Sequence, residues 1–258
     1  MKKNITKILL TAFSAAFMAV NLSSCTKSDS TDTGSITEAD AAQVTTDAVT
    51  PSTGGVVGQV SSAAGLFSNA TVTGGTVSVI NNRPRAIEST IPCGSEKDST
   101  ITYASVAGAV PSFSYSLTWK YTLLCTVPSS LTLNFNGSGS YNGIALSSTF
   151  TSSGGFVLSG LAAASPDYTY NANYSRAGVT TSKVGDKNTF NHSLTITSSN
   201  ILYDKASQEI VSGTATVAVK ITSSSGKVYS YGGTLTFLGS KTATLVLNSG
   251  TVYHLSWS

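Results

Sequence analysis

Apolar and polar residues alternate along residues 113–127 of this chain. Every odd position is aromatic, aliphatic or cysteine, and every even position except Leu124 is polar. Successive side chains of a strand point to opposite faces, so the segment is predicted to be a strand with one apolar and one hydroxyl-rich face. A helix would spread both sets of residues around its circumference.

The same period of two recurs in later segments, and turn-forming residues separate them. Connections this short cannot make parallel crossovers, so an α/β fold is excluded for residues 110–258. We predict an all-β fold, an antiparallel up-and-down meander of long strands. The residues expected to share its apolar face are Ile144, Leu146 and Phe150; Tyr168, Tyr170, Ala172 and Tyr174; Phe190, Leu194 and Ile196; Ala215, Val217, Val219 and Ile221; Tyr229, Tyr231, Leu235 and Phe237; Leu245 and Leu247; and Tyr253, Leu255 and Trp257.

The apolar face of such a sheet has to be removed from water. The sheet can curl into a barrel, fold into a sandwich, or be covered by residues 36–66 as helix. We expect an open barrel or sandwich formed by a single β domain over residues 56–258. A short helix is expected over residues 35–48, with Ser35 or Thr37 as its N-cap and acidic residues in its first turn.

The first residues are typical of a secretion signal, with three lysines before an apolar core over residues 8–20. The tetrapeptide Leu22-Ser23-Ser24-Cys25 that follows resembles the lipobox of bacterial lipoproteins. The resemblance implies that residues 1–24 are removed as a signal peptide and that Cys25 is acylated and becomes the first residue. The alternative is an ordinary signal peptide followed by an unrelated cysteine. Two or three acyl chains would make membrane attachment stable.

Charge adds little to this picture. The chain has 258 residues and a formal net charge of +3, which the three signal-region lysines supply. The rest is formally neutral, which argues against nucleic acid as a partner and leaves the anchor as the source of membrane association. Residues 25–55 form an acidic tether that includes the short helix. We expect the protein to be located in the cell envelope, anchored to the outer membrane. The sequence does not decide between the periplasmic face and the cell surface. Asp29 and Asp32 loosely resemble the acidic residues that direct some lipoproteins to the surface.

Cys93 and Cys125 remain after the anchor, and an exported pair of cysteines predicts one disulfide. Cys125 lies on the apolar face, so the bond is expected to be largely buried. Free thiols that bind a metal are the alternative, although no histidine lies near either cysteine in the sequence.

The residues offer little catalytic chemistry. The only histidines are His192, expected on the core face, and His254, expected in solvent. The carboxylates fall mostly at predicted turns, the Glu96-Lys97-Asp98 cluster is expected to be an exposed loop, and the glycines of Gly137-Ser138-Gly139 are expected to form bulges or bends. The sequence carries no nucleotide, Ca²⁺ or zinc motif, so no cofactor, metal or enzymatic activity is predicted. Two segments resemble bacterial O-glycosylation sites, centred on Ser30 and Ser99.

Three functions remain in view. The first is a lipid-anchored structural or interaction protein of the envelope with an unidentified protein partner. The second is a carrier that encloses an apolar ligand such as a lipid, which the aromatic side chains of one strand would line. The third is a hydrolase that uses one of the two histidines, with a serine–histidine–aspartate arrangement left open. The residues that would line the carrier are Phe113, Tyr115, Trp119 and Tyr121.

Overall fold

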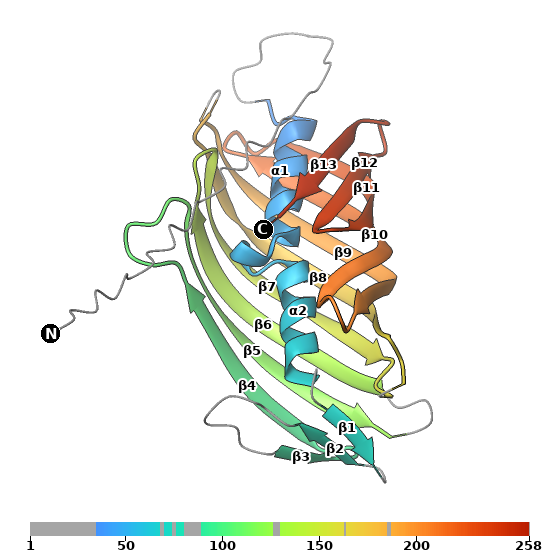
Figure 1. The fold of residues 1–258 in the computed structure, drawn as a ribbon. Coiled ribbons are helices and arrows are strands. Elements are labelled where there is room, and N and C mark those ends of the chain that lie inside the picture. Colours follow the sequence, from blue (N-terminus) through green and yellow to red (C-terminus); the bar gives the residue numbers. More distant parts are fainter. Residues whose placement is uncertain are drawn as a thin grey trace, which may run out of the picture.

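The computed structural model describes residues 35–67, 70–73, 76–79, 89–125, 130–162, 164–184 and 187–257. Two α-helices and a short 3-10 helix precede thirteen strands (Figure 1). The helices are α1 (Glu38–Val49), η1 (Pro51–Thr53) and α2 (Val56–Phe67). The strands are β1 (Ala70–Thr73), β2 (Thr76–Val79), β3 (Ser89–Pro92), β4 (Glu96–Ala104), β5 (Ser112–Leu124), β6 (Ser130–Asn142), β7 (Leu146–Ser159), β8 (Asp167–Ser182), β9 (Thr189–Asp204), β10 (Glu209–Ser223), β11 (Val228–Gly239), β12 (Thr242–Leu247) and β13 (Val252–Ser256).

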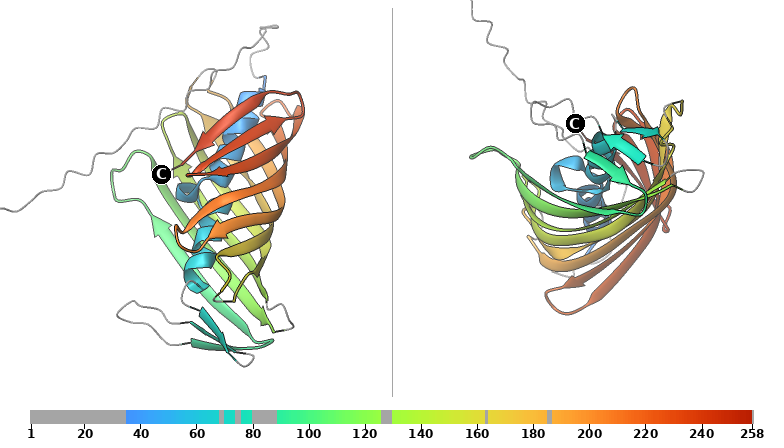
Figure 2. Two further views of the ribbon diagram at one scale, coloured as in Figure 1. Left: turned by 45° about the vertical axis from the view of Figure 1, so that its right-hand side comes forward. Right: turned by 90° about the horizontal axis from the view of Figure 1, so that it is seen from below.

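Ten consecutive strands, β4 to β13, form one antiparallel sheet in which each strand pairs with its neighbours in sequence. The predicted meander is therefore confirmed. The sheet curls strongly but does not close, so β4 and β13 are its two edges (Figure 2). Strands β1, β2 and β3 form a separate small antiparallel sheet.

The burial of side chains follows the predicted alternation in β5. Its inward-facing Leu117, Trp119 and Leu123 are buried, and Thr118 and Lys120 between them are exposed. Ile144 was expected on the same face as Leu146 and Phe150, and this prediction is wrong. Ile144 lies in the turn between β6 and β7 and is exposed, because the pleat that fixes side-chain direction ends with the strand.

The helices fill the concave side of the curled sheet, as the two further views show (Figure 2). Helix α1 begins as predicted at one of the two candidate caps, Thr37. The side chain of Thr37 accepts a hydrogen bond from the Asp40 N–H, and the Asp40 carboxylate accepts one from the Thr37 N–H. Two of the three expected ways of removing the apolar face from water are therefore combined, because the sheet curls and the helices also cover its apolar face.

Residues 56–67 are helical, which agrees with the alternative of a helical cover over residues 36–66 and differs from the expected β domain that begins at residue 56. The valines of this segment favour strands in isolation. In the structure the buried residues of α2 recur with helical spacing, so packing against the sheet outweighs local preference. These residues are Val56, Val57, Val60, Ala63 and Ala64. No helix in the described part of the chain is long and apolar enough to span a bilayer.

Two local predictions also need correction. Pairing continues without a register shift past Gly137 and Gly139, so neither glycine forms a bulge. A Cβ atom on Gly139 would lie 2.6 Å from the ring of Phe150, so this glycine makes room for an aromatic side chain. Residues 96–98 are the beginning of edge strand β4 and pair with β5 rather than forming a loop.

Candidate functional site

The aromatic residues of β5 belong to the packed interior. Trp119 has no exposed surface, and its ring centroid lies 6.0 Å from that of Phe135 and 6.3 Å from that of Phe156. Tyr115 is buried with its ring against Gly54, next to η1. Phe113 and Tyr121 are half-buried and pack against the same core. These four candidate ligand-lining residues therefore contact protein, and the helices occupy the space that a ligand would need.

A buried polar cluster lies between the helices and the sheet, centred on Arg176 of β8. The Arg176 side chain is 2% exposed and donates a hydrogen bond from Nη2 to the backbone carbonyl of Thr53. Its guanidinium carbon lies 3.5 Å from the centroid of the Phe150 ring, a cation–π contact. Arg176 thereby links η1 to two strands of the sheet.

Asp47 brings a carboxyl group from α1 into this cluster. Burial raises the pKa of Asp47 to about 7, and the Arg176 charge and a hydrogen bond from Gln43 offset only part of that rise. The Thr53 hydroxyl donates to the Asp47 carbonyl oxygen, which ties the end of α1 to η1. The carboxyl is therefore poised to change its protonation near neutral pH.

His192 completes the cluster from β9, on the core face as the alternation predicts. Burial, together with the Arg176 charge, lowers the pKa of His192 to about 4, so the imidazole is neutral at pH 7. Its Nδ1 lies 3.1 Å from the hydroxyl of Thr180. Three further buried polar atoms lie here without a well-formed hydrogen bond: Ser152 Oγ, the Tyr174 hydroxyl and Arg176 Nε. Tyr174 is close to both of the other residues.

This cluster supplies polar contacts that fix the position of the helices on the sheet. A neutral imidazole and a carboxyl of raised pKa are also the groups that acid–base chemistry uses. Both groups are enclosed, however: Asp47 is 8% exposed and His192 5%. The geometry therefore favours a structural role for the cluster.

Three hollows among the described residues are of interest. One, of about 780 Å³, is a shallow depression where outward-facing serines and threonines of β5, β6 and β7 surround Gly139 and Gly178. Two smaller ones, of about 160 and 250 Å³, lie between α2 and the strands β8 to β10 and share Ser61 and Gln208. Of the four candidate ligand-lining residues, Tyr115 borders the first of these hollows, as do Phe150 and His192, whereas Trp119 lines none of the three.

The other candidate residues lie apart from one another. His254 is exposed on β13, 3.5 Å from the Thr244 hydroxyl. Hydrogen bonds from Ser207 lower the pKa of Asp204, which is the turn chemistry that the sequence indicates. In the part of the chain that the structure describes, no three histidine, cysteine, aspartate or glutamate side chains gather into a metal site.

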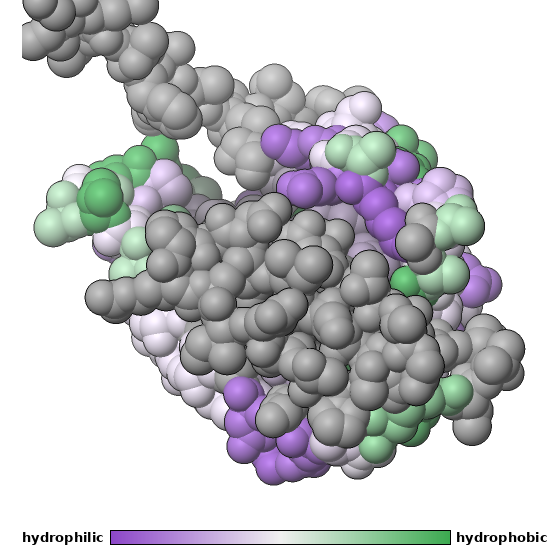
Figure 3. Space-filling model, turned by 60° about the horizontal axis from the view of Figure 1, so that its bottom comes forward, coloured by the Kyte–Doolittle hydropathy of each residue, from purple (hydrophilic) through white to green (hydrophobic). Residues whose placement is uncertain are grey.

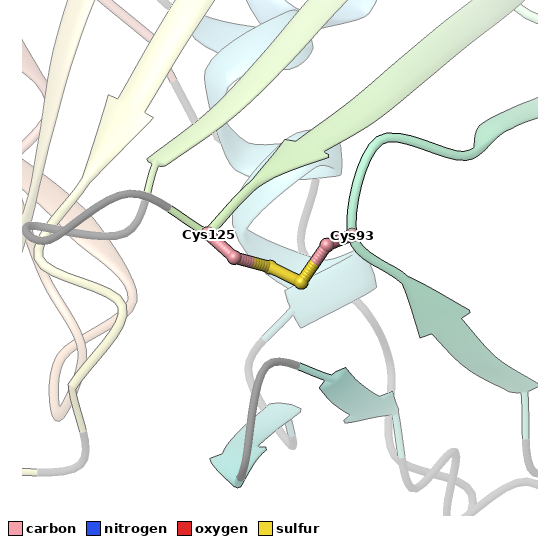
Figure 4. Close-up of a disulfide and its surroundings, with 2 residues drawn as sticks. All are labelled: Cys93 and Cys125. Carbon is pink, nitrogen blue, oxygen red and sulfur yellow. A yellow bond between two sulfur atoms is a disulfide. The ribbon is translucent and has the colours of Figure 1, made fainter.

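Cys93 and Cys125 form the predicted disulfide, with their Cα atoms 5.6 Å apart (Figure 4). The bond is less buried than expected, because Cys93 lies in an exposed turn before β4 and only Cys125 packs against the core. Cys25 and Ser30 lie outside the described residues. Ser99 lies in edge strand β4.

Sequence reasoning missed Asp47 and Arg176. For Arg176 a signal was present, since it shares the parity of Tyr170 and Tyr174 and so had to point inward. For Asp47, the helical spacing from Ala41, Val44 and Ala48 likewise indicated a position on the buried face of the helix.

Comparison with known proteins gives no further guidance. No protein-family model, curated protein or solved structure matches this chain.

Proposed function

We propose that this protein is a lipid-anchored component of the bacterial cell envelope with a non-catalytic structural or interaction role. The observation that carries the proposal is the covered concave face. Helices α1 and α2 occupy the space where a curled sheet could hold a ligand, and Trp119 is fully buried beside them. The surface that remains available for interactions is the outer face of the sheet, on which serine, threonine and asparagine predominate.

The anchor follows from the resemblance of residues 22–25 to a lipobox. Only ten positions separate Cys25 from Ser35, where the described structure begins. A chain of that length spans at most about 35 Å, so the domain would be held close to the bilayer. The convex surface of the sheet would then be available to a protein partner.

The proposal is tested by expressing the full chain in a Gram-negative host and separating membrane from soluble material. The wild-type protein should be recovered with the membrane, and its first residue should be Cys25 bearing acyl chains by mass spectrometry. Cys25→Ala should abolish the acyl mass and release the protein once the signal is removed. Ser23→Ala, which keeps a small residue in the motif, is the matched control and should behave as wild type. An unmodified Cys25 in the wild-type chain contradicts the proposal.

A second candidate function is a carrier of an apolar ligand, in which the helices are displaced. Polar atoms without partners lie where the helices meet the sheet and favour this alternative, since each weakens the packing of the cover. Gln59 Oε1 on α2 and Trp119 Nε1 on β5 are two of them. Native mass spectrometry of the purified chain separates the two functions. A reproducible extra mass equal to a lipid supports the carrier, and the bare polypeptide mass supports the self-filled scaffold.

A further inference from the structure

The connections of a meander lie alternately at its two ends. One end carries the loops after β4, β6, β8, β10 and β12, and we call these loops, with the start of α1, the tether rim. The start of α1 is fixed there by two contacts. The Tyr231 hydroxyl donates to the Ile36 carbonyl oxygen at 2.8 Å, and the Thr251 hydroxyl donates to Glu38 Oε2 at 2.7 Å. The segment leading back to Cys25 therefore leaves the domain at this rim.

Exposed aliphatic side chains concentrate on the tether rim. In the described part of the chain, six large apolar side chains are at least half exposed, and five of them are in or beside these loops. The sixth, Leu238, lies near the opposite end, on β11. Scattered apolar residues on a surface need no explanation, but a set gathered on one rim marks a contact surface. The five residues of the rim, 50–79% exposed, are Val106, Val110, Ile144, Val184 and Val228.

The β4–β5 loop contributes two of these residues and stands out from the body of the domain (Figure 1). Seen from below, apolar side chains gather on this projecting loop (Figure 3). The β6–β7 and β8–β9 loops are joined, because Lys183 Nζ donates to the carbonyl oxygen of Gly143 at 2.7 Å. Ile144 and Val184 are thus held on neighbouring, connected loops.

Carboxylates are confined to one end of the sheet. All the carboxylates of strands β4 to β13 that the structure describes lie toward the far end: Glu96, Asp98, Asp167, Asp204 and Glu209. Lysines lie at both ends. Those at the far end, Lys97, Lys120, Lys205 and Lys241, accompany these carboxylates, whereas the lysines near the tether rim have no described carboxylate of the sheet beside them. The lysines near the rim are Lys183, Lys187, Lys220 and Lys227. The carboxylates of α1 at this rim, Glu38 and Asp40, accept hydrogen bonds from Thr251 and Thr37. The rim therefore pairs apolar loop tips with cationic side chains, the combination that binds anionic lipid surfaces.

We propose that the tether rim is a membrane-docking surface, whose aliphatic loop tips enter the headgroup region of an anionic phospholipid bilayer while its lysines contact lipid phosphates. The proposal rests on the proposed lipid anchor at Cys25, which would bring this rim to the bilayer. The rim then sets the orientation of the domain, with the far end and its carboxylates directed away from the membrane.

The test uses the full lipidated chain in vesicles of phosphatidylethanolamine and phosphatidylglycerol. Val106→Cys and Ile144→Cys are labelled with an environment-sensitive fluorophore, and Leu238→Cys, as exposed as Ile144, is the matched control at the far end. We expect blue-shifted emission at positions 106 and 144, and loss of most of that emission when the lipids carry nitroxide quenchers. Position 238 should respond to neither. Equal, water-like emission at all three positions overturns the proposal.

Failure of the anchor is recognised separately, because the intact mass of each sample reports whether Cys25 is acylated. If it is not, the same chain is sedimented with the same vesicles. Binding without an acyl group supports the rim, and the absence of binding overturns it. A variant that misfolds is identified by circular dichroism and replaced by Val184→Cys, which lies on a third loop of the same rim.

The lysines are tested with a pair of double variants. Lys187→Gln/Lys227→Gln should weaken the quenching at position 106 in anionic vesicles, and added salt should weaken it further in the wild type. Lys120→Gln/Lys241→Gln removes two exposed charges from the other half of the domain and should leave the quenching unchanged. Equal effects of the two double variants contradict a role for the rim lysines.

Discussion

The hydroxyl of Tyr170 donates a hydrogen bond to the carbonyl oxygen of Val60 across 3.2 Å, joining β8 to α2. Both groups are buried, and burial raises the pKa of Tyr170 well above its ordinary value, so the hydroxyl stays protonated and able to donate. With the hydrogen bond between Ser61 and Tyr203, this bond adds specific polar contacts to a helix that otherwise packs on the sheet mainly through valine and alanine.

Tyr170→Phe should lower the free energy of unfolding by about 1 kcal/mol, because it removes one buried hydrogen bond and keeps the ring. Tyr174→Phe is the matched control. Tyr174 is equally buried, but its hydroxyl lies beside Ser152 and Arg176 without a well-formed hydrogen bond, so its removal should cost less than that of the Tyr170 hydroxyl. Urea denaturation of both variants measures the difference, and a larger loss for Tyr174→Phe would contradict the assignment.

The stability of the domain should depend on pH through two groups that act in opposite directions. The pKa of Asp47 is raised to about 7 in the folded state, so the folded state gains stability as pH falls from about 7 toward 4. The pKa of His192 is lowered to about 4, so the folded state loses stability as pH falls from about 6.5 toward 4. The two effects largely cancel in the wild type.

Single variants should separate them. In Asp47→Asn the histidine acts alone, and the free energy of unfolding should fall on acidification below pH 6.5. In His192→Asn, which keeps a polar atom near the position of Nδ1, it should rise on acidification over the same range. Chemical denaturation at several pH values checks both slopes, and slopes of equal sign would show that these two groups do not control the dependence.

Gly54→Ala should be strongly destabilising. Gly54 has φ +66°, where a side chain is strained, and a Cβ atom would lie 3.1 Å from the ring of Tyr115. Gly65→Ala in α2 should have the opposite effect on stability, since a Cβ atom at this position would have no atom within 4 Å. It should raise stability by about 0.5–1 kcal/mol through helix preference. Thermal unfolding of the two variants should therefore shift in opposite directions from wild type.

Replacing both cysteines of the disulfide by alanine should cost about 3.7 kcal/mol by the loop-entropy model, given a sequence separation of 32. Because Cys93 is exposed, a mild reductant should open the bond in the folded protein. The mass of the alkylated protein reports reduction, and denaturation then measures the loss. An unchanged midpoint would show that the crosslinked segment adds nothing to the cooperative fold.

The sheet could be predicted from the sequence because each inward position is fixed by its own strand. Trp119 and Tyr170 face the core through an alternation that needs no distant partner. A helical cover over residues 36–66 was one of three alternatives, but the sequence could not select it, since Val56, Val57 and Val60 favour a strand until a sheet exists to pack against. The polar cluster could not be predicted either, because it depends on a contact between Arg176 and Thr53, which are 123 positions apart in the sequence. Periodicity predicts which way a residue points, but not what lies opposite it.

If the protein is exported as proposed, the placement of α1 and α2 inside the curled sheet also bears on the order in which it folds. If the chain crosses the inner membrane from its N-terminus, these helices arrive first, yet the surface that buries them is complete only when β13 has followed. Until then their valines and alanines would stay in contact with water or with a chaperone. Contacts between segments so far apart in sequence also form slowly. Release from the export machinery would therefore precede the formation of the native core, which makes a holding chaperone more useful to this protein than to one that can fold strand by strand.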